Sequence, residues 1–162
     1  MPSTHVRLYY HIIFSTKERR RMIADPWREE LHAYIGDILR EIDATPSSVG
    51  GAGDHVHVLL SLKATHTLSE VTRQMKRGSS LWIHRQGSAK FAWQEGYGAF
   101  TVSPSQLSKV QRYIEDQVEH HRKKTFEEEY VELLRLSGVE FDEKYLWQRG
   151  NPRTPPACDS SG

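Results

Sequence analysis

The sequence predicts an α+β protein with a ferredoxin-like split βαβ antiparallel sheet and additional C-terminal helices. Two observations lead to this fold class. Short β-branched and aromatic runs alternate with amphipathic helical stretches in the order β-α-β-β-α-β, and only helical patterns follow. A chain of 162 residues is also long enough to bury a core within one domain. Such a sheet has helices on one face, so its other face is left for a ligand or for the additional helices.

The first half of the chain supplies a strand, a helix and a short strand. Residues 6–14, VRLYYHIIF, are β-branched and aromatic and predict a strand. Residues 25–43 predict a helix, because apolar side chains recur along them at helical spacing. Asp25 is a suitable N-cap for this helix, and Pro26 suits its first position. Residues 45–51 predict a short strand and turn.

The second half supplies two more strands and three helices. Residues 54–62, DHVHVLLSL, predict a strand that carries two histidines. Residues 68–85 predict a helix with apolar positions along one side. Residues 96–102, GYGAFTV, predict the last strand. Two further helices are predicted over residues 105–124 and 126–136.

Composition excludes several classes of protein. Cys158 is the only cysteine, so an intramolecular disulfide and a cysteine-based metal site are excluded. No apolar run approaches the roughly 18 residues of a membrane span, and no secretion signal is visible, so we expect a cytoplasmic protein without membrane contact. The net charge of +1 hides basic clusters that suit phosphate binding. Residues 148–162 have no apolar period and are expected to form a disordered tail.

His55 and His57 stand two residues apart in the strand predicted over residues 54–62. Successive side chains of a strand point to opposite faces, so both imidazoles share one face, with Cα atoms about 6.5–7 Å apart. The chain contains nine histidines, so such a pair also arises by chance. The pair alone leaves both a metal site and two structural histidines open.

Tyr113 and Gln117 are four residues apart in the helix predicted over residues 105–124. They therefore share one helix face, about one turn or 6 Å apart. They flank an apolar stripe with the same spacing, formed by Val110, Ile114 and Val118. A packing tyrosine and an exposed glutamine also fit this pattern. His120 and His121 end the helix, where cationic residues suit its dipole, and are expected to be structural or DNA-facing.

Several motifs, taken in order, resemble the IS200/IS605-type single-domain HUH tyrosine (Y1) transposases, including the REP-associated tyrosine transposases. The resemblance covers about residues 6–147 and includes DHVHVLLSL, VTRQMKRGSSLWIHRQ, FAWQEGYGAFTVS, YIEDQ and FDEKYLW. It implies that residues 1–147 form a Y1 transposase-like catalytic domain. Five motifs in the right order are more specific than either short spacing.

The resemblance implies that His55, His57 and Gln117 hold a divalent ion, Mg²⁺ or Mn²⁺. It implies that Tyr113 attacks single-stranded DNA, with a hairpin expected, and forms a 5′-phosphotyrosine through which strands are cut and rejoined in DNA transposition. Three neutral ligands leave the charge of the ion available for polarising a phosphate. Asp54 is expected to be either a turn residue or a partner that orients one imidazole.

Arg73, Lys76, Arg77 and Arg112 are candidate phosphate contacts. In many members of this family the tyrosine helix crosses to a partner subunit, which implies a homodimer, whereas REP-associated relatives can work as monomers. Two other functions stay open at this stage. One is a metal-dependent DNA hydrolase that uses activated water, and the other is a non-catalytic nucleic-acid-binding ferredoxin-like module.

Overall fold

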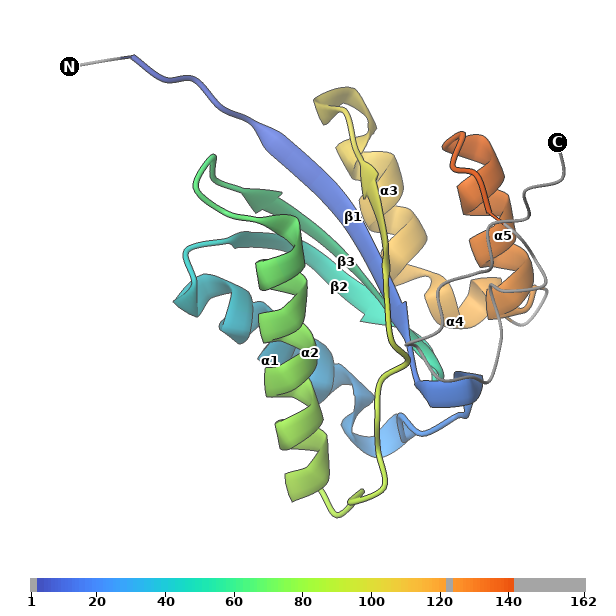
Figure 1. The fold of residues 1–162 in the computed structure, drawn as a ribbon. Helices are drawn as coiled ribbons and strands as arrows, with labels where there is room; N and C mark the ends of the chain where they lie inside the picture. Colours follow the sequence, from blue (N-terminus) through green and yellow to red (C-terminus); the bar gives the residue numbers. More distant parts are fainter. Residues whose placement is uncertain (1–2, 122–123, 142–162) are drawn as a thin grey trace, which may run out of the picture.

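The computed structural model describes residues 3–121 and 124–141, in which four strands form one antiparallel sheet with the order β2-β3-β1-β4 (Figure 1). The strands are β1 (Leu8–Ser15), β2 (Thr45–Gly51), β3 (His55–Leu62) and β4 (Gly98–Thr101). This is the strand order of a ferredoxin-like sheet, so the predicted α+β fold class is confirmed. The strands predicted at 6–14, 54–62 and 96–102 correspond to β1, β3 and β4, with bounds shifted by one or two residues.

Helices cover both faces of the sheet in the part of the chain that the structure describes. They are α1 (Asp25–Glu41), α2 (Leu68–Arg85), α3 (Leu107–Glu115), α4 (Gln117–His120) and α5 (Phe126–Leu136). Two short 3₁₀ turns, η1 (Lys17–Arg19) and η2 (Pro104–Gln106), join them to the strands. Figure 1 shows α1 and α2 on one side of the sheet and α3, α4 and α5 on the other. The additional C-terminal helices therefore occupy the face that the sequence analysis left open.

None of the helices formed by the described residues has both the length and the apolar character needed to cross a membrane. The disordered tail predicted for residues 148–162 lies outside the described part of the chain. The same holds for the end of the domain predicted over residues 1–147, so both boundaries stay predictions.

The main core lies between the sheet and the helices α1 and α2. Alternate side chains of β1 and β3 point to this face, which therefore collects apolar residues. Its buried members include Ile12, Phe14, Leu31, Ile35, Leu39, Val56, Val58, Leu60 and Met75. Because apolar groups fill this face, the histidines of β3 point to the opposite one.

Helix α1 begins one residue earlier than a cap at Asp25 implies. Ala24 is the N-cap, with extended backbone angles (φ −75°, ψ 138°), and Asp25 already lies in the first turn. The predicted N-cap role of Asp25 is therefore wrong. Its carboxylate instead pairs with Arg28 one turn along, where a negative charge still suits the helix N-terminus.

The single helix predicted over residues 105–124 is also wrong, because the chain forms three shorter pieces there. Pro104 starts the 3₁₀ turn η2, and α3 follows it. The helix breaks at Asp116, whose backbone angles are φ −93° and ψ 17°, and α4 continues beyond it. At the break the Gln117 side-chain amide donates to the Tyr113 carbonyl at 3.2 Å. A side chain thus donates to a helix carbonyl, as backbone N–H groups do within a regular helix.

Helix α3 lies close to the sheet at Gly50 of β2. A Cβ atom at Gly50 would lie 2.4 Å from the Ile114 carbonyl oxygen, well inside van der Waals contact. Ile114 itself is buried. Glycine at this position therefore allows α3 to approach the sheet, and this approach brings Tyr113 and Gln117 to the face that carries the histidines.

We expect Gly50→Ala to lower the free energy of unfolding by about 1–3 kcal/mol, because the new methyl group meets backbone and α3 must move away. Urea unfolding measures this change. Gly36→Ala is the matched control, because its Cβ would meet only the flexible Arg40 side chain at 3.4 Å. That control should be neutral or slightly stabilising. Equal stability of the two variants would contradict the close packing of α3 on β2.

Candidate metal and nucleophile site

The histidines of β3 are fully buried on the sheet face that α3 covers, with exposed fractions of 0% for both His55 and His57. Each ring has a partner on its Nδ1 atom. His55 Nδ1 lies 2.7 Å from Asp54 Oδ1, and His57 Nδ1 lies 2.7 Å from His11 Nε2 on β1. These contacts fix the ring orientations and leave both Nε2 atoms available for a shared ligand, which is the usual arrangement around a metal-binding histidine.

The two helix residues singled out in the sequence reach the histidines. Gln117 Oε1 lies 3.0 Å from His55 Nε2 and 2.9 Å from His121 Nε2. The Tyr113 ring lies edge-on to His57, with ring centroids 5.7 Å apart. Tyr113 thus approaches histidines of its own chain, and the four-residue spacing on the helix places both side chains in one site.

Glu129 of α5 joins the site, although the sequence analysis did not identify it. One oxygen, Oε1, lies 2.9 Å from His57 Nε2 and 3.8 Å from His55 Nε2. The other, Oε2, lies 3.2 Å from His121 Nε2 and accepts a hydrogen bond from the Tyr113 hydroxyl. The carboxylate is buried, with 2% of its surface exposed. It contacts both the histidines and the tyrosine.

A sequence signal for Glu129 exists in the spacing of α5. Phe126 and Leu134 are buried, and Glu129 lies three residues after Phe126, on the same helix face. Glu127 and Glu128 are exposed. A carboxylate within an otherwise apolar helix stripe is therefore the feature that distinguishes Glu129 from its acidic neighbours.

His120 and His121 lie in the site rather than on a free surface. His120 Nε2 is 3.1 Å and His121 Nε2 is 3.2 Å from Glu129 Oε2. His11 lies in the first predicted strand, and the sequence suggested no function for it. Its Nε2 atom contacts the Nδ1 atom of His57 on the neighbouring strand. No local pattern identifies His11, because its partner lies on another strand and the register between strands is a long-range property.

Burial controls the charges in the site. It lowers the pKa of His57 to about 4, and burial followed by the charge of His57 lowers the pKa of His11 to about 3. Burial alone would raise the pKa of Glu129, but hydrogen bonds from His121 and His57 outweigh it and hold that pKa far below its usual range. Burial, and then the charge of Glu129, raises the pKa of the Tyr113 hydroxyl well above its usual value. The site thus combines an ionised carboxylate with neutral rings at His11 and His57 and a protonated tyrosine.

The donor atoms fit a divalent ion. One ligand atom from each of His55, His57, His121 and Glu129 can be chosen so that all lie within 4.8 Å of one another. In an octahedral shell with bonds of about 2.1 Å, adjacent ligand atoms lie about 3.0 Å apart. The contacts of 2.9 Å between His57 and Glu129 and of 3.0 Å between His55 and Gln117 match that spacing. The donor set of imidazole nitrogens, a carboxylate and an amide oxygen is therefore suited to such an ion.

Two of the candidate phosphate contacts have other partners. Lys76 donates to the carbonyls of Gln94 at 2.7 Å and Gly96 at 2.9 Å, which ties the segment before β4 to α2. Arg73 pairs with a glutamate one turn earlier on α2. Arg77 is exposed on the same helix, which lies on the opposite side of the sheet from the histidines. Backbone carbonyls thus engage the Lys76 ammonium group, and its contact with DNA stays a prediction.

Other basic residues lie nearer the site. Arg112 is exposed on α3, the element that carries Tyr113. Residues 17–21, which follow β1, include four basic side chains. Burial alone would raise the pKa of Asp54, but the hydrogen bond with His55 and smaller contributions, among them the charge of Arg21, lower it. Positive charge thus borders the site on the side of η1 as well as on α3.

Comparisons with known proteins cover most of the chain. Residues 4–117 match the family described as "Transposase IS200 like". The ISDra2 transposase TnpA of Deinococcus radiodurans is 25% identical over 118 residues, which cover 68% of this chain and 84% of that protein. The segment that matches the family contains His55, His57, Tyr113 and Gln117, and it ends before α5.

Two solved structures share the fold. A crystal structure assigned as a transposase from Deinococcus radiodurans has a TM-score of 0.60 and 23% identity, covering 72% of this chain and 95% of that chain. A REP-associated tyrosine transposase bound to a REP hairpin has a TM-score of 0.55 and 15% identity, covering 74% of this chain and 73% of that chain. At these identities the likeness concerns the fold alone.

We expect Mn²⁺ to raise the melting temperature of the protein by about 5–10 °C at a hundredfold excess over its dissociation constant, with a smaller effect for Mg²⁺. Either His55→Ala or His57→Ala should remove the shift, because each deletes a buried nitrogen donor. His5→Ala, at an exposed position away from the site, is the control and should keep the shift. A wild-type protein that does not respond to either ion would favour the non-catalytic binding module.

Proposed function

The chain belongs to the IS200-like transposase family, and we propose that it cuts and rejoins single-stranded DNA through a 5′-phosphotyrosine intermediate. The observation that carries this proposal is the contact between Tyr113 and the histidine cluster of the same chain. The Tyr113 hydroxyl donates to Glu129, whose other oxygen lies 2.9 Å from His57 Nε2. A tyrosine oxygen beside a divalent-ion site suits nucleophilic attack on a phosphate.

The proposed reaction exchanges one phosphate ester for another. The Tyr113 oxygen loses its proton and forms a bond to phosphorus, and the bond from phosphorus to the 3′ oxygen breaks. The departing oxygen takes up a proton, so one fragment ends in a free 3′-OH while the other is joined to tyrosine through its 5′ phosphate. A 3′-OH from another strand can reverse the step, which rejoins DNA without an external source of energy.

The metal-holding role falls in this proposal to His55, His57 and Gln117, whose Nε2 and Oε1 atoms lie in one buried cluster. Mg²⁺ or Mn²⁺ bound there supplies positive charge for the phosphate oxygens and the departing oxygen. Nitrogen ligands favour Mn²⁺, whereas abundance in cells favours Mg²⁺. Asp54 orients His55 through the contact at Nδ1.

The proposed substrate is single-stranded DNA that contains a hairpin. The REP-associated relative was solved with a REP hairpin, which supports this class of substrate. A single strand can lead one phosphate into a largely buried site, whereas duplex DNA is stiff and would have to deform. Arg112, exposed on the tyrosine helix, is the first candidate for a phosphate contact, with Arg77 as a more distant one.

We expect Tyr113→Phe to bind DNA and Mn²⁺ as the wild type does but to form no covalent adduct, because the ring stays and only the nucleophilic oxygen is lost. A denaturing gel with labelled DNA hairpins from the flanks of its gene measures the adduct. Wild-type protein should become joined to the fragment on the 5′-phosphate side, leaving a free 3′-OH on the other. Tyr97→Phe, at an exposed tyrosine, is the matched control and should keep the adduct.

Mass spectrometry of the trapped peptide should place the nucleotide on Tyr113. An adduct on Tyr97, Tyr130 or Tyr145 would contradict the assignment of the nucleophile. Cleavage of DNA by Tyr113→Phe at the wild-type rate, without an adduct, would identify water as the nucleophile and support the metal-dependent hydrolase.

We expect the protein to bind a single-stranded hairpin at least tenfold more tightly than a blunt duplex of the same length. Affinity should fall steeply as salt rises, because each phosphate contact releases counterions. Arg112→Gln should reduce the slope of log affinity against log salt by about one contact. Fluorescence anisotropy over a salt series measures both effects, and equal affinity for the duplex would exclude the proposed substrate class.

A further inference from the structure

We propose that Glu129 is a metal ligand and that its second oxygen positions the Tyr113 hydroxyl, so that α5 completes the active site. This inference rests on the proposed transposase chemistry. It does not follow from the family match, which ends at residue 117, whereas Glu129 lies on the later helix α5. It also adds a charged donor to three ligands that are otherwise neutral.

The burial of Glu129 is the first argument. Among the acidic side chains whose burial the structure describes, Glu129 is the only one that is buried. A carboxylate removed from water costs several kcal/mol unless charges or hydrogen bonds compensate it. Its Oε1 atom faces the Nε2 atoms of His57 and His55, at 2.9 Å and 3.8 Å, where the proposed ion would be held. A divalent cation among these donor atoms would add a full counter-charge to the hydrogen bonds that the carboxylate already receives.

The division of contacts between the two oxygens is the second argument. Oε1 faces the strand histidines, at 2.9 Å from His57 Nε2 and 3.8 Å from His55 Nε2. Oε2 faces the helix side and accepts from the Tyr113 hydroxyl. One oxygen is thus placed among the metal donors while the other holds the nucleophile, so the carboxylate can set the distance between ion and tyrosine.

The seating of α5 is the third argument. Phe126, one turn before Glu129, stacks on the His55 ring with centroids 4.5 Å apart and planes 19° apart. Tyr130, the next residue, lies over Gly98 of β4, where a Cβ would be 2.7 Å from its ring. Ring contacts of Phe126 and Tyr130 therefore hold α5 against the sheet and keep Glu129 in the site. The position of the helix does not depend on the charge of Glu129 alone.

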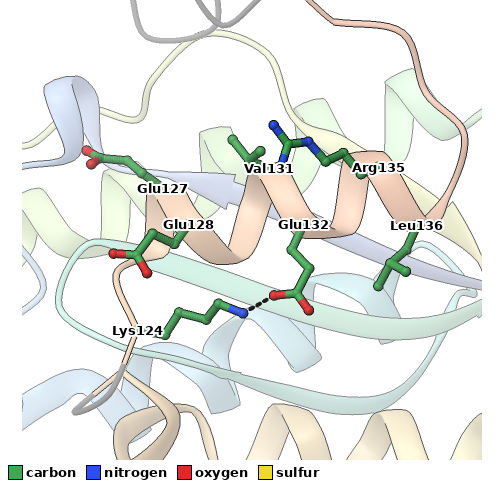
Figure 2. Close-up of a pocket in the computed structure, with 7 residues that line it drawn as sticks. All are labelled: Lys124, Glu127, Glu128, Val131, Glu132, Arg135 and Leu136. Atoms are coloured by element: carbon green, nitrogen blue, oxygen red, sulfur yellow. Dashed lines mark hydrogen bonds and ion pairs between the residues drawn. The ribbon is translucent and has the colours of Figure 1, made fainter.

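The outer side of α5 supplies a control. Figure 2 shows Glu127, Glu128 and Glu132 around a shallow hollow that includes none of the cluster residues. In this hollow Glu132 pairs with Lys124. Glu128 is exposed and accepts from Thr125 at the helix start. Its replacement by glutamine changes the charge of α5 as Glu129→Gln does, without changing the cluster.

The test measures Mn²⁺ affinity of the full chain by the paramagnetic resonance signal of free Mn²⁺. Glu129→Gln keeps the shape of the side chain and one oxygen but removes the charge, so affinity should fall at least about tenfold. Glu128→Gln should keep wild-type affinity. Melting curves in a chelator establish that both variants are folded before metal is added.

A second measurement separates positioning from metal binding. With Mn²⁺ raised until Glu129→Gln is saturated, its adduct should still form at least about tenfold more slowly than that of the wild type, because the Tyr113 hydroxyl has lost its charged acceptor. A wild-type rate under saturation would overturn the positioning role. A faster rate with unchanged affinity would mean that the carboxylate occupies the place of a DNA phosphate, and would overturn both roles.

His55→Ala distinguishes failure of this inference from failure of the proposed function. If His55→Ala lowers Mn²⁺ affinity and Glu129→Gln does not, the transposase site stands and Glu129 is not a ligand. If neither variant changes affinity and no adduct forms, the proposed metal site and function are wrong together with the role of Glu129.

Discussion

A negative charge buried where β3, α3, α4 and α5 meet is the interaction on which the rest of the site depends. Glu129 accepts from Tyr113 and faces imidazoles from the sheet, from α4 and from His121 just after it. Hydrogen bonds from these groups offset the cost of removing the carboxylate from water. Apolar packing explains why the helices lie against the sheet. The carboxylate explains why the polar side chains of separate elements point to one place, since a buried charge without partners would destabilise the fold.

The sheet prepares this meeting point before any helix arrives. The two-residue period of β3 assigns its valines to the main core and its histidines to the other face. The contacts at the two Nδ1 atoms, from Asp54 and from His11, then turn both Nε2 atoms outward from the sheet. Gly50 allows α3 to come close enough for its side chains to reach those atoms. The Nδ1 contacts can orient the rings only because the strand places both histidines on this face. The approach of α3 in turn matters only because the rings present their Nε2 atoms to it.

Local patterns predicted the order of elements and the shared face of the strand histidines, because apolar period and spacing are properties of neighbouring residues. The Tyr-Gln spacing also placed both side chains on one face, even though the helix that carries them is interrupted at Asp116. That break, and the role of Glu129, could not be read locally. Both depend on which side chains α3, α4 and α5 meet after folding, as does the engagement of Lys76 by backbone carbonyls. The face on which a side chain lies could therefore be predicted where neighbours along the chain define it, whereas contacts between distant segments could not.

Tyr113 lies against histidines of its own chain, and Glu129 comes from that chain as well. With the roles proposed above, each polypeptide in this arrangement carries the nucleophile and the metal ligands of one site, so one copy supplies all of them. This has a genetic consequence. A cell with two damaged copies, one lacking a strand histidine and the other lacking the tyrosine, would not regain activity through intragenic complementation.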